Sequence, residues 1–197
     1  MKKQSLKFVP VDMNNIILAT QTQMSFWPTE CGFNSYYRAY KKGKPYYLVY
    51  DGDTLVGITG IYDDERLGEE HTAWLGWFGV LEVFRKRGLG KEILLQTLRL
   101  AKSMGYDTLR LNSSKREDVC PNALHFYTKM IDKLGGFLED YTLEQQDQEM
   151  IVVSFPISTK KITKWGNRKL YLDDDLKDEQ EGYKNFLKHI KHEGKKE

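Results

Sequence analysis

The sequence has very few cysteines, since only Cys31 and Cys120 occur among its 197 residues. Neither stands at the spacing of a metal-binding cysteine pair, so no metal site is predicted. Isolated thiols of this kind are typical of a reducing compartment, and we therefore expect a cytoplasmic protein. The segment Met1–Gln4 is not followed by an apolar run of signal-peptide length, which agrees with that expectation.

Long hydrophobic runs are missing as well. No stretch approaches the roughly 18 consecutive apolar residues of a membrane-spanning helix, so a membrane partner is not expected. The formal net charge is only +2, which is too small to indicate nucleic-acid or membrane binding by itself. Internal repeats and low-complexity tracts are absent too. A chain of this length and composition is sufficient for one globular domain with its own core.

The hydrophobic pattern alternates between strand and helix periodicity. Predicted strands cover residues 6–11, 45–50, 54–62, 72–81, 108–112, 137–143 and 150–155. Predicted helices cover residues 12–22, 34–42, 91–103 and 121–134, with Asp12 as the N-cap of the first and Pro121 in the first turn of the last. This order predicts an α/β (α+β) fold with a mixed sheet and helices on both faces.

The junction after the strand at 72–81 is the most informative segment. A hydrophobic stretch, Trp74–Val83, leads into the basic segment Arg85–Lys91, here called the glycine loop, and a periodic helix follows. Backbone N–H groups in such a loop can point at phosphate oxygens, and the helix N-terminus adds about half a positive charge. Gly88 and Gly90 allow close approach of the backbone. Countercharge can come from Arg85, Arg87 and Lys91. We therefore predict a pyrophosphate site.

Two common phosphate-binding motifs are excluded by spacing. A P-loop needs Ser or Thr after Gly90-Lys91 and a glycine five positions before Gly90, but these positions hold Glu92 and Arg85. The dinucleotide fingerprint needs a third glycine where Ile93 stands. The remaining pattern is Arg-x-x-Gly-x-Gly between a strand and a helix.

That pattern resembles the acyl-CoA-binding signature of the GNAT acyltransferase superfamily. A second block, Asn122–Tyr127 followed by Gly135-Gly136-Phe137, resembles the later signature of the same family. The resemblance covers roughly residues 5–156 and implies the GNAT-like fold, a mostly antiparallel sheet with one splayed parallel pair. It predicts an acetyltransferase domain at 1–156. Residues 157–197 then form a C-terminal extension, with a short strand at 168–172 and an amphipathic helix carrying Tyr183, Phe186, Leu187 and Ile190.

The resemblance also implies acetyl-CoA as co-substrate, with no metal. Backbone N–H groups near Gly79–Leu81 would hold the acyl carbonyl, and those of Arg85–Gly90 would hold the pyrophosphate. Asn122 would either bind the cofactor or only cap the local turn. The complete implied set of cofactor-binding residues is Gly79, Val80, Leu81, Arg85, Lys86, Arg87, Gly88, Leu89, Gly90, Lys91, Asn112, Asn122 and Tyr127.

Tyr127 is the implied catalytic residue. In the family, a tyrosine at this motif position lies near the CoA sulfur and can protonate the departing thiolate. A phenol with a pKa of about 10 carries its proton at neutral pH and is ready to donate it. The alternative is a core tyrosine with a buried ring and a satisfied hydroxyl.

A general base is harder to identify. The strand at 72–81 contains no acid, and Glu70 is about 30 Å along the chain from Val80. Glu30, Glu144 and Glu149 are candidates, and an amine of low pKa could also lose its proton to solvent. The aromatic residues near Glu30 either wall an acceptor pocket or pack the first helices on the sheet; they are Phe26, Trp27, Phe33, Tyr36, Tyr37 and Tyr40.

The resemblance implies an acetyl-CoA-dependent N-acetyltransferase that acts on a primary amine by direct attack in a ternary complex. The acceptor would be a small molecule or a peptide, and a homodimer remains open. Two alternatives also remain open. One is a non-catalytic acyl-CoA-binding regulatory module, because the strand lacks an acid. The other is an RNA-directed acetyltransferase, because Arg85–Arg87 and the tail are basic, although nucleic acid is not the expected partner.

Overall fold

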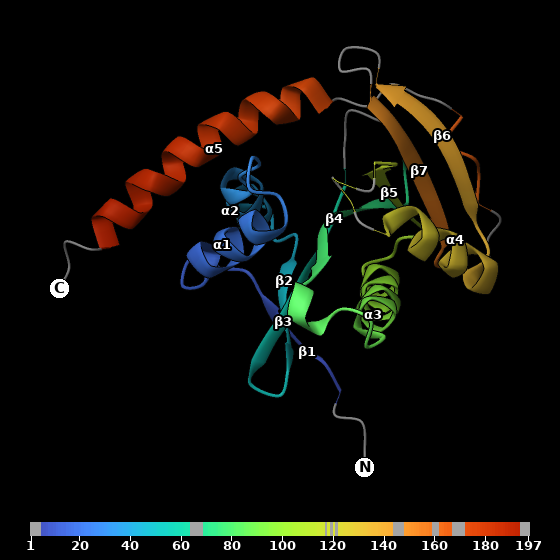
Figure 1. The fold of residues 1–197 in the computed structure, drawn as a ribbon, viewed down its shortest axis with the longest axis horizontal. Coiled ribbons are helices and arrows are strands. Elements are labelled where there is room, and N and C mark those ends of the chain that lie inside the picture. Colours follow the sequence, from blue (N-terminus) through green and yellow to red (C-terminus); the bar gives the residue numbers. More distant parts are fainter. Residues whose placement is uncertain are drawn as a thin grey trace. The chain divides into compact units, whose positions relative to one another are not determined.

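The computed structural model describes residues 5–63, 69–116, 118, 120, 122–143, 148–158, 162–166 and 172–193. Within these residues the chain forms a mixed α/β fold with one seven-stranded sheet in the order β1-β2-β3-β4-β5-β7-β6 (Figure 1). The predicted fold class is therefore confirmed. In the described residues, no helix is both long enough and apolar enough to cross a bilayer.

The strands and helices follow one another as the hydrophobic pattern predicts. The strands are β1 (Lys7–Pro10), β2 (Tyr46–Asp51), β3 (Thr54–Tyr62), β4 (Thr72–Val80), β5 (Thr108–Ser114), β6 (Phe137–Leu143) and β7 (Gln148–Pro156). The helices are α1 (Ile16–Phe26), α2 (Phe33–Lys41), the short 3-10 helix η2 (Glu82–Phe84), α3 (Leu89–Ser103), α4 (Ala123–Leu134) and α5 (Leu172–Glu193).

The sheet combines antiparallel pairs with one parallel pair. β1 pairs with β2, β2 with β3, β5 with β7, and β6 with β7, all antiparallel. β4 pairs with β5 in parallel over Thr72–Trp74 and Thr108–Arg110. The predicted parallel pair is therefore present. Its register of three residue pairs is short for strands of nine and seven residues.

Two predicted boundaries are wrong at the N-terminal helix. α1 begins at Ile16 and ends at Phe26, so it starts and stops four residues later than predicted. Asp12 does not cap it, because the Asp12 carboxylate accepts the Asn14 N–H at 2.8 Å while the Asn15 side chain accepts the Asp12 N–H at 2.9 Å. Short polar side chains favour such local turns as readily as caps.

Two further predictions concern residues that lie wholly or partly outside the described part of the chain. Pro121 lies outside the described residues. The predicted strand at 168–172 lies there too, except for Leu172, which begins α5.

The chain divides into two compact units. The first unit comprises Met1–Tyr62, Gly76–Ile93 and Leu170–Glu197, and the second comprises Asp63–Leu75 and Leu94–Lys169. β4 and α3 each contribute to both units. The predicted division at residue 156 follows the sequence resemblance and stays a prediction.

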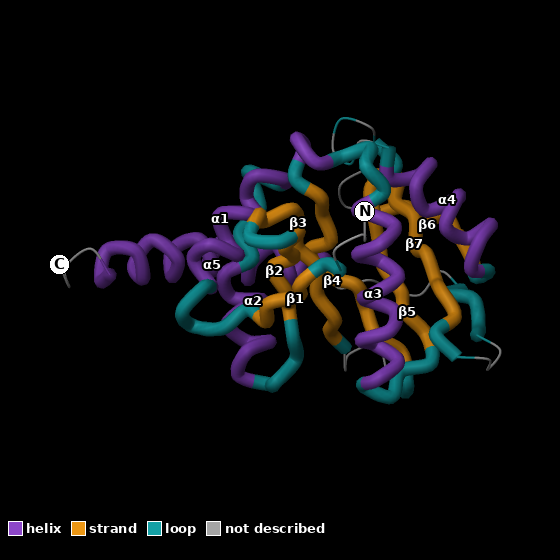
Figure 2. Tube along the Cα trace, turned by 90° about the horizontal axis from the view of Figure 1, so that it is seen from below, coloured by secondary structure: helices purple, strands orange, loops and turns teal. Residues whose placement is uncertain are grey.

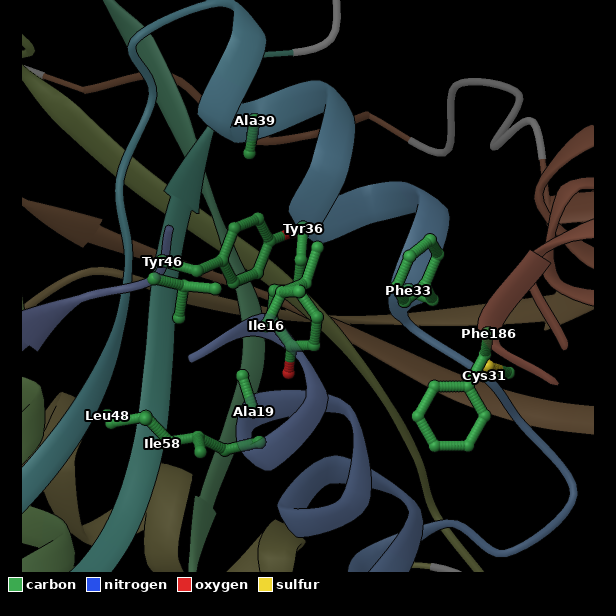
Figure 3. Packing of buried hydrophobic residues seen from close by; sticks show 11 residues of the cluster. Ile16, Ala19, Cys31, Phe33, Tyr36, Ala39, Tyr46, Leu48, Ile58 and Phe186 are labelled. Carbon is green, nitrogen blue, oxygen red and sulfur yellow. The ribbon is translucent and has the colours of Figure 1, made fainter. Parts of the chain in front are cut away.

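The core of the first unit lies between β2–β3 and the helices α1, α2 and α5 (Figure 3). Ile16, Tyr36 and Leu48 are buried in it. α5 joins this core through Phe186, whose ring centroid lies 6.1 Å from that of Phe33 in α2. Of the four residues in the predicted apolar stripe of α5, only Phe186 is buried; the exposed members are Tyr183, Leu187 and Ile190.

The second unit contains β5–β7–β6 with α4 packed against them (Figure 2). A buried cation sits at its centre, because the side chain of Arg110 in β5 is only 1% exposed. The guanidinium forms two hydrogen bonds with the carboxylate of Glu69, at 3.1 and 3.2 Å. It also donates to the Ser154 hydroxyl at 2.5 Å. The paired charge therefore joins the segment before β4 to two neighbouring strands.

Residues 162–166, here called the strap, cover the same cation. The carbonyl of Thr163 accepts a hydrogen bond from Arg110 at 3.2 Å, and the Trp165 ring lies 5.7 Å from the guanidinium carbon. The Glu139 carboxylate on β6 accepts the N–H groups of Trp165 and Gly166. Trp165 also packs edge-on against Trp74, with ring centroids 5.3 Å apart. The strap is therefore an integral layer of the second unit.

Substituting Glu69→Gln should destabilise the protein by about 3 kcal/mol, because an uncompensated charge would remain buried at Arg110. Urea denaturation measures this loss. The matched control is Asp118→Asn, which breaks the exposed ion pair between Arg116 and Asp118 and should leave the midpoint unchanged. Equal midpoints for Glu69→Gln and the parent protein would contradict the assigned role of the pair.

Candidate functional site

The last residues of β4 have an irregular backbone. Trp77 has φ +45°, a conformation that is uncommon for a bulky residue and is found mainly where the surrounding structure enforces it. Two residues later the backbone of β4 comes very close to β3, because a Cβ added at Gly57 would lie 2.4 Å from the carbonyl oxygen of Gly79. The ring of Phe26 packs on the other side of Gly79. The end of β4 is therefore held from two directions within the first unit.

Of the three residues predicted to face the acyl carbonyl, Leu81 has its N–H group already occupied. That group donates to the Val56 carbonyl at 2.9 Å. The amide of Leu81 is thus unsuited to an oxyanion role, and Gly79 and Val80 remain as candidates. The carbonyl of Val80 accepts a hydrogen bond from Arg85 Nε at 3.0 Å, which fixes the chain direction into the glycine loop.

The amides of the glycine loop are mostly without an acceptor within the described residues. η2 precedes it and uses the N–H of Arg85, which donates to Glu82 at 3.0 Å. In the described part of the chain, the N–H groups of residues 86–91 have no hydrogen-bond acceptor. Lys86 and Gly88 both have left-handed φ angles, +60° and +82°. Successive N–H groups in such turns form a concavity that binds anions, and the start of α3 at Leu89 adds its dipole.

The side chains of the loop support this backbone. Leu89 is buried with Val49, Val56 and Ile93, and it anchors the start of α3 to the sheet. Arg87 stacks over the Phe84 ring at 5.4 Å, so this arginine also stiffens the loop. A Cβ added at Gly88 would meet no atom within 4 Å, which leaves open space over the amides. Further positive charge comes from the exposed side chains of Lys86 and Lys91.

The remaining predicted site residues belong to the second unit. Tyr127 lies on α4, is 7% exposed and packs edge-on against Phe126 at 5.1 Å. Burial, with a smaller contribution from Cys120, raises the pKa of the Tyr127 hydroxyl, so the group keeps its proton throughout the physiological range. Asn122 precedes α4 with φ +60° and makes no cap hydrogen bond with its side chain. Asn122 thus occupies the N-cap position of α4 without a side-chain hydrogen bond to the first turn of the helix, and its role at the cofactor stays a prediction. Asn112 lies in β5 opposite Val152.

The candidate bases differ sharply in their surroundings. Glu30 is half-buried, and desolvation raises the pKa of its carboxyl group. Glu149 is exposed, and Glu144 lies outside the described residues. Glu69 is committed to Arg110. Sequence reasoning singled out neither this pair nor Trp77, since a residue 41 positions away and a local backbone angle leave no periodic signal.

The comparisons with known proteins agree with this geometry. The model of the acetyltransferase (GNAT) family matches residues 13–131. No curated protein matches the sequence. Among solved structures, a GNAT family acetyltransferase from Elizabethkingia anophelis with acetyl-CoA bound has 16% identity, a TM-score of 0.59, and coverage of 78% of this chain and 99% of that one.

Two other solved structures have the same fold. The Bacillus subtilis acetyltransferase in complex with CoA has 14% identity and a TM-score of 0.55, with 77% of this chain and 97% of that chain covered. The ribosomal-protein-S18-alanine N-acetyltransferase from Escherichia coli has 12% identity and a TM-score of 0.57, with 81% and 99% covered. These identities show a shared fold alone, whereas the family model spans more than half of the sequence. The chain belongs to the GNAT acetyltransferase family.

Proposed function

We propose that the protein is an acetyl-CoA-dependent N-acetyltransferase that transfers the acetyl group to a primary amine. The observation that carries this proposal is the row of N–H groups at residues 86–91, which donate to no described residue. Unpaired N–H groups at a helix start form a natural diphosphate site. Structures of the same fold with CoA or acetyl-CoA bound support the choice of ligand.

The glycine loop would bind the diphosphate of acetyl-CoA through these amides. Lys86 and Lys91 supply countercharge, while Arg85 and Arg87 mainly hold the loop in shape through Val80 and Phe84. An N–H group of Gly79 or Val80 would donate to the thioester carbonyl oxygen and stabilise the negative charge that develops there. Asn112 and Asn122 stay proposed contacts of the cofactor.

The reaction requires two proton movements. A neutral amine attacks the thioester carbonyl carbon, the C–N bond forms, and the C–S bond then breaks. Tyr127 would donate its proton to the departing thiolate, and the amine loses one proton to a base. The raised pKa of Tyr127 keeps the phenol protonated before this step, and the resulting phenolate regains its proton from water.

Two secondary predictions accompany this activity. Cys31 and Cys120 are both free thiols, which supports the predicted cytoplasmic location. The homodimer that the sequence leaves open would use the exposed apolar residues on α5, which are Tyr183, Leu187 and Ile190.

A regulatory module that binds acyl-CoA without catalysis is the main alternative, because β4 contains no acidic side chain. Release of free thiol from acetyl-CoA in the presence of an amine panel separates the two functions. Thiol release with any amine supports the enzyme. RNA-directed acetylation is favoured only by the basic loop and tail, and an RNA gel shift that weakens steeply with salt would support it.

Tyr127→Phe should lower turnover about 100-fold, since it removes the proton donor and leaves the buried ring in place. Affinity for CoA, measured by calorimetry, should stay unchanged. Tyr183→Phe is the control, because Tyr183 is an exposed tyrosine on α5. Normal turnover of the Tyr127 variant would remove the residue from the mechanism.

Gly88→Asp should abolish CoA binding, because the carboxylate would fill the open space over the loop amides and repel the diphosphate. The control is Gly43→Asp, since Gly43 also has a left-handed φ, +65°, and also has open space around it. Both variants carry the same backbone strain, so a difference between them in calorimetry isolates the binding effect. Normal CoA affinity of Gly88→Asp contradicts the site.

A further inference from the structure

Three half-buried aromatic rings lie in a row within the first unit. Phe26 and Trp27 come from the end of α1, and Trp77 comes from β4. The ring centroids of Phe26 and Trp27 are 5.4 Å apart, and those of Trp27 and Trp77 are 5.5 Å apart. None of the three rings is fully buried. This row, here called the aromatic wall, therefore keeps part of its surface accessible.

The loop beside the aromatic wall is fixed by buried polar contacts. Gln23 is fully buried, and its side chain accepts the Gly32 N–H at 2.8 Å and donates to the Glu30 carbonyl at 3.3 Å. Gly32 in turn lies directly against Trp77, because an added Cβ would be 2.9 Å from the indole nitrogen. The neighbouring residues therefore hold Trp77 at its strained φ angle. Backbone strain of this kind is concentrated at functional sites, where the surrounding structure maintains it.

Glu30 places a carboxylate on this loop, and its N–H donates to the carbonyl of Trp27 at 3.1 Å. The residue is half-buried, and desolvation raises the pKa of its carboxyl group. Within the part of the chain that the structure describes, this carboxylate has no hydrogen-bond donor and no cation as a partner. A desolvated carboxylate of this kind is stabilised by a cation supplied from outside.

The aromatic wall also leads to the proposed acyl carbonyl site. Phe26 packs against Gly79, with ring atoms 3.1 Å from the position of an added Cβ. An amine that attacks the carbonyl carbon must approach it to about 3 Å. The acceptor of the proposed reaction must then lie close to Phe26 and Gly79, on elements that all belong to the first unit.

We propose that the aromatic wall and Glu30 bind the acceptor as an organic ammonium ion with a flat aromatic or apolar body, and that Glu30 accepts its proton. Trp and Phe faces attract cations, and the carboxylate supplies the countercharge. One proton moves from the ammonium nitrogen to a Glu30 oxygen, which leaves a neutral amine and a neutral carboxyl group. The carboxyl group then returns the proton to solvent. This inference rests on the proposed acetyltransferase function. Acceptors with an acid beside the amine are disfavoured, because Glu30 repels them.

Binding can be tested without catalysis by using benzyltrimethylammonium, a cation that cannot be acetylated. Trp74 and Trp165 are 2% and 1% exposed, so saturable quenching of the intrinsic fluorescence would report Trp27 and Trp77. Calorimetry should show about tenfold weaker binding for Glu30→Gln and for Trp27→Leu, and no binding of the uncharged benzyl alcohol. Glu70→Gln is the matched control, because Glu70 is exposed and lies in the second unit, and it should bind the probe normally.

Catalysis gives the second measurement. With 2-phenylethylamine as acceptor, Glu30→Gln should lower kcat/KM about 100-fold, and the remaining activity should rise steeply with pH, because the variant depends on the small fraction of amine that is already neutral in solution. Phenylalanine, which adds a carboxylate, should be a poor acceptor. Acetylation without probe binding, and with full activity of Glu30→Gln, overturns this inference and leaves the proposed function standing. Saturable probe binding without acetylation of any amine supports the ammonium-binding site but contradicts the proposed function, and with it the role of Glu30 as proton acceptor.

The stability of the Glu30→Gln variant distinguishes a Glu30 that is free to bind an acceptor from a Glu30 that is paired within the fold. The raised pKa means that ionised Glu30 is less favourable in the folded chain than in the unfolded chain. This cost is absent below the unfolded pKa and grows as the pH rises through the folded pKa. Glu30→Gln should therefore unfold at the same or a higher urea concentration than the parent at pH 8. A clear loss of stability would show that Glu30 is already paired within the fold, and the proposal would fail.

Discussion

The proposed chemistry depends on the peptide N–H groups of residues 86–91, which have no acceptor among the residues that the structure describes. A helix cannot satisfy the N–H groups of its first turn internally. Among the described residues at the start of α3, the first N–H group with a carbonyl acceptor is that of Glu92, which donates to Gly88. Leu89 makes this arrangement possible, because its burial with Val49 and Ile93 ties the helix start to the sheet. The hydrophobic contact thus fixes the helix start at which the unpaired N–H groups lie.

The glycine loop could be predicted because all of its determinants are contiguous. Two glycines, four basic residues and a strand-to-helix change lie within a few positions, so local sequence defines the motif. Most strand positions were also predictable, since short apolar runs bounded by turn residues indicate strands. The start of α1 was not, because Asp12, Asn14 and Asn15 offer several equivalent turns and caps, and only the tertiary fold selects among them.

Non-local features escaped sequence reasoning for a different physical reason. Glu69 and Arg110 gave no sequence pattern, since an ion pair can form between segments that are distant in the sequence and that only the fold brings together. The hydrogen bond from the Leu81 N–H to the Val56 carbonyl escaped prediction for the same reason, because it joins residues that are distant in the sequence. Glu30 shows the limit most clearly. Its residue type was noted as a candidate base, but burial is what distinguishes it from Glu149.

The strap has a consequence for how this protein is made. During synthesis, β5 and β7 emerge from the ribosome before residues 162–166, so Arg110 can pair with Glu69 while its stacking partner Trp165 is still missing. The two strap N–H groups that bind Glu139 arrive last of all. A nascent chain halted at the end of β7 would therefore expose Trp74 and an incompletely covered guanidinium, which is the kind of surface that chaperones recognise.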